Sequence, residues 1–157
     1  MDNSSILKLI RTTEEKEESI SLIKSLLENN YKNRLTAEFE SSSPFLGNLW
    51  NYISSKITKF EGNRLEIEKY LNSVLVKIQD QKTLKITLAI KPSGKLVDTI
   101  TNWAQKNLSE EIIFDIEVDP RIIGGAIIIS NKGEFADFSL LKKIDNIFSS
   151  KKAEILQ

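Results

Sequence analysis

The chain has 157 residues, with no histidine, no cysteine, and 22 basic side chains balanced by 22 acidic ones. The missing residue types exclude a Ser-His-Asp triad, a thiol nucleophile, a disulfide and a His-containing zinc site, and the neutral charge gives no general attraction to nucleic acid or anionic lipid. Because no apolar run reaches the roughly 18–20 residues that span a bilayer, and the N-terminus is not basic as in a signal peptide, we expect a soluble, cytoplasmic protein.

Apolar residues recur at helical spacing in the first half of the chain. A short apolar segment comes first, over residues 4–11. Thr12, followed by acidic residues, is typical of a helix N-terminus, and Asn29-Asn30 is a candidate break in that helix. We expect its buried face to carry Ile20, Ile23, Leu27, Tyr31 and Leu35.

Two further helices are predicted before residue 82. Ser43 is a candidate N-cap with Pro44 in the first turn. Gly62 should end this helix, and Asn63 with Glu66 has the spacing of a capping box for the next one. The predicted apolar stripes are Leu46, Leu49, Trp50, Ile53, Ile57 and Phe60 in the first helix, and Ile67, Leu71, Val74, Leu75 and Ile78 in the second.

The apolar period changes to two after residue 82. Residues 84–90 and 112–118 alternate as half-buried strands, and Pro92-Ser93-Gly94 starts a helix between them, with Trp103 expected in the core. Residues 127–129 carry no polar alternation, which predicts a strand buried on both faces. Beyond it we expect a turn at 131–133, an edge strand at 134–138 and a final helix over 140–148.

The order of these elements predicts an α+β fold. An N-terminal helical bundle, residues 1–82, is followed by a small β-α-β-β-α domain, residues 83–157. The expected inward positions of the second part are Leu84, Ile86, Leu88 and Ile90, then Leu96, Val97, Ile100, Trp103, Ala104 and Leu108, then Ile112, Phe114, Ile116 and Val118.

The corner between the second and third strands is the candidate site. It contains Asp119, Pro120, Ile123, Gly124 and Gly125. The Gly pair enters a strand and lacks the spacing of a phosphate-binding loop, so it marks a bulge or a place where a partner helix or strand packs closely. An RNA-binding KH module would need a Gly-x-x-Gly loop beside basic residues, which the chain lacks.

Three carboxylates occupy alternate positions of the second strand and its end. Asp115, Glu117 and Asp119 could bind a divalent cation or act as acid-base groups. The solvated face of an amphipathic strand explains them better. We therefore assign no catalytic residue, no metal ligand and no cofactor site.

The corner also carries a family resemblance. The run Val118-Asp119-Pro120-Arg121-Ile122-Ile123-Gly124-Gly125, followed by an apolar strand, resembles the signature near the C-terminus of the delta subunit of bacterial F-type ATP synthase, the family of the mitochondrial oligomycin-sensitivity-conferring protein. The order of elements over residues 84–148 is similar to that family's C-terminal domain, with Asp137-Phe138-Ser139 at the place of its Asp-x-Ser. The N-terminal half is shorter than the family's helical bundle.

The resemblance implies a non-enzymatic stator. Such a peripheral-stalk subunit of a proton-translocating F-type ATP synthase links the alpha subunits of the catalytic head to subunit b and resists rotor torque. It implies a cytoplasmic location on the inner face of the bacterial cell membrane, which the chain reaches only through the complex. Two alternatives stay open: the stalk protein of archaeal or vacuolar-type ATPases that also ends in an α/β domain, and an unrelated α+β protein-interaction adaptor.

Overall fold

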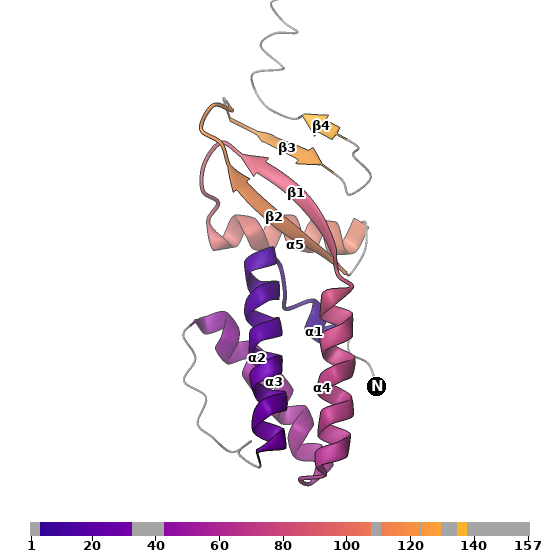
Figure 1. Cartoon of the computed structure of the whole chain (residues 1–157). Coiled ribbons are helices and arrows are strands. Elements are labelled where there is room, and N and C mark those ends of the chain that lie inside the picture. The colour runs from indigo at the N-terminus through magenta and orange to yellow at the C-terminus, as the bar shows by residue number, and fades with distance from the viewer. Residues whose placement is uncertain (1–3, 33–42, 108–110, 123, 130–134, 138–157) are drawn as a thin grey trace, which may run out of the picture.

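A computed structural model describes residues 4–32, 43–107, 111–122, 124–129 and 135–137 (Figure 1). Helices come first and a four-stranded sheet follows, which confirms the α+β class. The elements are α1 Ser4–Leu7, α2 Thr13–Tyr31, α3 Pro44–Ile57, the 3-10 turn η1 Thr58–Phe60, α4 Arg64–Gln79, β1 Lys82–Leu88, α5 Gly94–Asn107, β2 Ile112–Val118, β3 Ala126–Ile129 and β4 Phe135–Asp137. The turn expected at 131–133 and the helix expected at 140–148 lie outside the described residues.

The predicted helix starts are confirmed by side-chain caps. Thr12 Oγ1 accepts the backbone N–H of Glu15 at 3.2 Å, and Ser43 Oγ accepts that of Leu46 at 3.2 Å. Each bond satisfies one of the backbone donors that the first turn of a helix leaves without a partner. The cap of α4 is one half of a capping box. Asn63 Oδ1 accepts the Glu66 N–H at 3.3 Å, but the Asn63 N–H donates to the Phe60 carbonyl.

Replacing Asn63 with alanine should lower the free energy of unfolding by about 1 kcal/mol, the usual cost of losing an N-cap. Asn63 is exposed, so the loss comes from the cap and not from the core. Urea unfolding measures it. Asn51→Ala is the control, because Asn51 is exposed inside α3 and alanine there improves helix propensity. An equal loss in both variants would contradict the assignment of the cap.

The helices enclose a core of their own. The apolar stripes predicted for α3 and α4 are buried or half-buried, with Trp50, Ile57, Phe60 and Leu75 at the margin. The fully or nearly fully buried members are Ile6, Leu7, Ile10, Leu22, Ile23, Leu26, Leu46, Leu49, Ile53, Ile67, Tyr70, Leu71, Val74, Ile78 and, from the sheet, Ile113.

The face predicted for α2 is partly wrong. Ile23 is buried, but Leu22 and Leu26 complete the inward face, while Tyr31 is 84% exposed. The helix also continues through the expected break to Tyr31. The reason is tertiary: Asn30 is buried, and its Nδ2 donates to the Arg64 carbonyl at the start of α4 at 3.1 Å.

The sheet has the strand order β2-β1-β3-β4. β1 and β2 are parallel, with Lys82 opposite Ile112 and Leu88 opposite Val118, and α5 makes the crossover between them. β3 pairs antiparallel to both β1 and β4, so the expected edge strand is present. A second core lies here. It contains Ile86, Leu88, Ala104 and Phe114, with Leu84, Ile100, Ile112, Ile116, Ala126 and Ile128 partly buried around them.

Several inward positions predicted for the sheet domain are wrong. β1 ends at Leu88, which leaves Ile90 73% exposed, and Val118 at the end of β2 is 43% exposed. Trp103, expected in the core, is 56% exposed on α5. β3 is half-buried rather than buried on both faces. The reason is that α2 and α5 contact β2, whereas β3 lies two strands away from β2 in the sheet.

Candidate interaction surfaces

The Asp-Pro corner, residues 119–125, is built on a short network of hydrogen bonds. The Asp119 N–H donates to the Leu88 carbonyl at 2.9 Å, which fixes the corner to the end of β1. Asp119 Oδ1 accepts the backbone N–H of Arg121 at 3.0 Å, an Asx turn. The Arg121 guanidinium donates to both oxygens of the same carboxylate. The Arg121 side chain thereby lowers the pKa of Asp119, so the carboxylate stays charged.

The Gly pair turns the chain into β3. Gly124 has φ +70° and Gly125 has φ +81°. These are left-handed conformations that glycine adopts without the steric cost of a Cβ. The Gly124 N–H donates to the Ile122 carbonyl at 2.9 Å, which closes a tight turn before them. Of the five residues predicted as the site, Ile123 lies outside the described residues.

The corner borders an apolar groove. Its other wall comes from the end of β1 and the start of α5, and its volume is about 570 Å³. Ile90 and Leu96 are exposed apolar side chains of its lining. Val118, also exposed, lies opposite Leu88 in the sheet register. The lining residues are Leu88, Ala89, Ile90, Leu96, Pro120, Ile122, Gly124 and Gly125.

The three carboxylates of β2 do not converge. Glu117 forms an ion pair with Lys85 of the neighbouring strand at 2.8 Å, which raises the pKa of Lys85, and Asp119 turns to Arg121. Among the described residues, no group of three His, Cys, Asp or Glu side chains is placed to hold a metal ion. The arrangement is that of a charged strand face.

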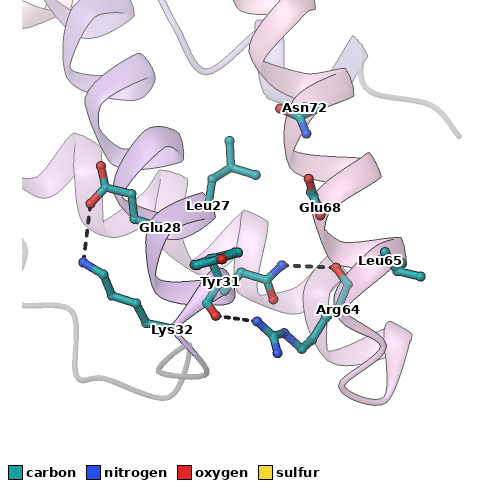
Figure 2. Close-up of a pocket in the computed structure, with 9 residues that line it drawn as sticks. Leu27, Glu28, Tyr31, Lys32, Arg64, Leu65, Glu68 and Asn72 are labelled. Atoms are coloured by element: carbon teal, nitrogen blue, oxygen red, sulfur yellow. Dashed lines mark hydrogen bonds and ion pairs between the residues drawn. The ribbon is translucent and has the colours of Figure 1, made fainter.

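A second apolar surface lies at the end of the helices away from the sheet. Figure 2 shows a cleft of about 690 Å³ between the C-terminal end of α2 and the N-terminal end of α4. Tyr31 and Leu65 are 84% and 68% exposed in it, beside Leu27. Glu28, Lys32, Arg64 and Glu68 add charges of both signs. An apolar floor with a charged margin is suited to bind an amphipathic segment.

Polar contacts fix the walls of this cleft. The Arg64 guanidinium donates to the Tyr31 carbonyl, and Asn30 joins the two helices as described above. The Asn30 side chain is buried beneath the cleft, and its Oδ1 has no hydrogen-bond partner in the described part of the chain. Sequence reasoning missed this surface. Its signal was Leu65, an apolar residue off the buried stripe of α4.

Comparison with known proteins connects the fold to a family. Within the described segments, no helix is long and apolar enough to cross a membrane. No curated protein matches the chain by sequence. The chain is similar in structure to a chain of the Polytomella F-ATP synthase, solved by cryo-EM in primary rotary state 3, with 16% identity and a TM-score of 0.41 over 49% of this chain and 98% of that one. The family model of the ATP synthase delta (OSCP) subunit matches residues 9–150. The chain therefore belongs to the ATP synthase delta (OSCP) subunit family.

Proposed function

We propose that the chain does its work by binding one partner at each end of the molecule. Its family makes it a peripheral-stalk (stator) subunit of an F-type ATP synthase, a part of that membrane-associated complex. A stator must hold two bodies that the rotor would otherwise turn relative to each other, so it needs two separate binding surfaces. The observation that supports this mode is the presence of two exposed apolar surfaces. One lies where α2 ends and α4 begins and the other where β1 ends, and Figure 1 shows these places at opposite ends of the molecule.

The distance between the two surfaces suits separate partners. The cleft lies at the N-terminal end of α4, and the C-terminal end of α4 leads into β1. The cleft wall extends along α4 from Arg64 to Asn72. At a rise of about 1.5 Å per residue, Leu65 in the cleft lies about 21 Å from Gln79, where α4 ends before the sheet. One helix bound at the cleft therefore leaves the groove at the Asp-Pro corner open.

We assign the groove at the corner to subunit b. Its exposed residues Ile90, Leu96 and Pro120 form an apolar surface, and the two glycines remove side chains where a partner helix would lie against the backbone. The stalk partner would bury these residues and convert exposed apolar area into affinity. This is the role we propose for Asp119, Pro120, Ile123, Gly124 and Gly125: they shape the wall and contact the partner.

We assign the cleft between α2 and α4 to the N-terminal segment of an alpha subunit of the head. Tyr31 and Leu65 provide the apolar contacts of a helix-in-groove interface. Tyrosine is among the residues that most often dominate such interfaces.

Two substitutions should separate the two interfaces. Ile90→Glu is expected to weaken binding of the soluble part of subunit b at least about thirtyfold, and Leu65→Glu to weaken binding of the alpha segment as strongly, the effect of losing one hot-spot contact. Both side chains are exposed, so the fold should persist. Calorimetric titration of each variant with each partner measures the four affinities.

Val76→Glu is the matched control, because Val76 is an exposed apolar residue of α4 that lines neither surface. It should leave both affinities unchanged. If Ile90→Glu and Leu65→Glu bind both partners as the parent chain does, the two-surface proposal is wrong. If both variants lose the same partner, the assignment of one surface to each partner is wrong.

The proposal extends to organisation and place. We propose that residues 1–82 and 83–157 act as separate binding units and that neither carries catalytic activity. The complex would hold the chain at the inner face of the cell membrane. Membrane fractions that keep the chain only while the rest of the complex is present would support this location.

A further inference from the structure

The helices and the sheet have separate cores, which raises the question of what fixes one against the other. The helical core and the sheet core share no buried residue. Among the described residues, Ile113 is the buried side chain of the sheet that belongs to the helical core. One buried side chain defines the angle between the two bodies only weakly, so polar contacts at the junction add to its definition.

Residues 7–16, which run from the end of α1 into the first turn of α2, make those contacts. The Arg11 carbonyl accepts the Phe114 N–H at 2.8 Å, and Thr12 forms a parallel bridge with Phe114, so the segment pairs with the outer edge of β2. Gln81 Nε2 donates to the Leu7 carbonyl at 3.3 Å. Lys16 Nζ donates to the carbonyls of Gln79 and Gln81 at 2.8 and 3.3 Å. The segment thus contacts the end of α4 and the edge of the sheet.

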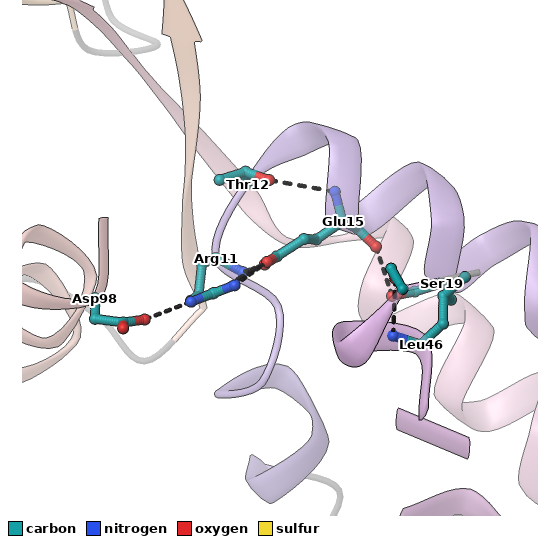
Figure 3. Close-up of polar contacts among 7 residues, drawn as sticks. Arg11, Thr12, Glu15, Ser19, Leu46 and Asp98 are labelled. Carbon is teal, nitrogen blue, oxygen red and sulfur yellow. Dashed lines mark hydrogen bonds and ion pairs between the residues drawn. The ribbon is translucent and has the colours of Figure 1, made fainter. Parts of the chain in front are cut away.

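Arg11 adds the third element. Figure 3 shows its guanidinium between Glu15 of α2 and Asp98 of α5. Arg11 Nε donates to Glu15 Oε1 at 3.0 Å, the Arg11 backbone N–H donates to Glu15 Oε2 at 2.7 Å, and the terminal nitrogens pair with Glu15 and Asp98. The planar, permanently charged guanidinium holds two carboxylates in a fixed geometry. Arg11 therefore joins α2, α5 and β2 through one residue.

Within the described residues, the helix that Arg11 reaches makes few contacts with the helices α1 to α4. α5 packs mainly against β2. A cavity of about 340 Å³ lies between α5, the start of α3 and the residues that follow α1, and Arg11 and Asp98 line that cavity. The ion pair crosses the gap where apolar packing is missing.

We propose that residues 7–16 are a clasp that fixes the angle between the sheet and the helices, with Arg11 as its positioning residue. The purpose rests on the stator role proposed above. Torque passes between two bound partners only if the body between them resists twisting. The two partner surfaces lie on opposite sides of the clasp. A twisting force between them therefore acts on the clasp, together with the link from α4 to β1 and the packing of α2 on β2.

Paired spin labels on the isolated chain test the clasp. The sequence has no cysteine, so Lys24→Cys on α2 and Lys95→Cys on α5, both exposed, give one label on each side. Arg11→Met should broaden the distribution of distances between the labels while circular dichroism stays unchanged. Exchange of the Phe114 amide hydrogen should become about tenfold faster, the effect of losing one charge-assisted contact.

Arg121→Met is the matched control, because Arg121 also pairs with a carboxylate but joins no two elements across the gap. It should leave the distances as in the parent chain. Asp98→Asn removes only the exposed ion pair between Arg11 and α5. It should broaden the distribution of label distances even if Arg11→Met unfolds the chain. An unchanged distribution in Asp98→Asn, together with an unchanged distribution or unfolding in Arg11→Met, would overturn the proposal. The spin-label experiment uses the chain without a partner. A negative result for the clasp therefore leaves the two-surface proposal standing, and a negative binding result leaves the clasp standing.

Discussion

Replacing Ile113 with alanine is expected to lower the free energy of unfolding by about 2–5 kcal/mol, the range for deleting a large aliphatic side chain in a packed core. Ile113 is fully buried. It projects from β2 into the core formed by α2, α3 and α4, while its neighbour Phe114 faces the sheet core. The cavity would open where the two bodies meet, and neither body can close it without losing the register of β2. Urea unfolding of the isolated chain measures the loss.

The control for Ile113→Ala comes from the other end of the same strand. Val118 is 43% exposed, so Val118→Ala should change the free energy of unfolding by less than about 0.5 kcal/mol, as usual for a surface position. A loss below about 1 kcal/mol in Ile113→Ala would mean that the junction repacks. It would then be the clasp, not this side chain, that holds the sheet to the helices.

Local signals in the sequence predicted local structure well. Ser43-Pro44 and Asn63 start helices because the capping bond spans three residues and needs no other part of the fold. The apolar stripes predicted for α3 and α4 were also correct, because each helix buries one face and the apolar residues recur at helical spacing along it. The Gly pair was predicted to enter a strand, and the structure places it directly before β3, where its positive φ values explain why glycine stands there.

Contacts between distant segments could not be predicted. Asn30 was predicted to break the helix. The residues next to it in the sequence give no sign that its side chain binds the Arg64 carbonyl. The alternation of β2 marked Phe114 as inward, but only the docked helices bury Ile113 on the opposite face. Arg11 carried no signal at all. Its importance comes from Asp98, which lies 87 positions further along the chain.

Two apolar residues near the candidate site were wrongly predicted to be buried, and their exposure carries information. Ile90 and Val118 continue the apolar pattern of their strands, so periodicity places them in the core. Pairing between β1 and β2 ends at Leu88 and Val118, and the chain turns away there. A pattern that a soluble domain would bury is thus left on the surface, next to a glycine-lined groove. This mismatch is the physical argument for a partner at the corner.

Tyr70→Phe should protect the chain against alkaline unfolding. Burial in the helical core raises the pKa of Tyr70 to about 12, with a smaller contribution from Tyr52, and its buried Oη has no hydrogen-bond partner within the described segments. Below pH 10 the phenol is neutral in both the folded and the unfolded chain. As pH rises from 10 to 12, the unfolded chain loses the proton and the folded chain keeps it, so stability falls by at most about 1.4 kcal/mol per pH unit.

Phenylalanine removes this titration and keeps the ring that packs 5.7 Å from Phe60. The advantage of Tyr70→Phe over the parent chain should therefore be small at pH 8 and should grow to about 2 kcal/mol by pH 12, measured by urea unfolding at each pH. Tyr31→Phe is the control, because Tyr31 is almost fully exposed, and its curve should follow that of the parent. An advantage that is the same at pH 8 and pH 12 would show that Tyr70 ionises as easily in the folded chain as in the unfolded one. The phenol would then reach water, and the helical core would be more open around α4 than its packing implies.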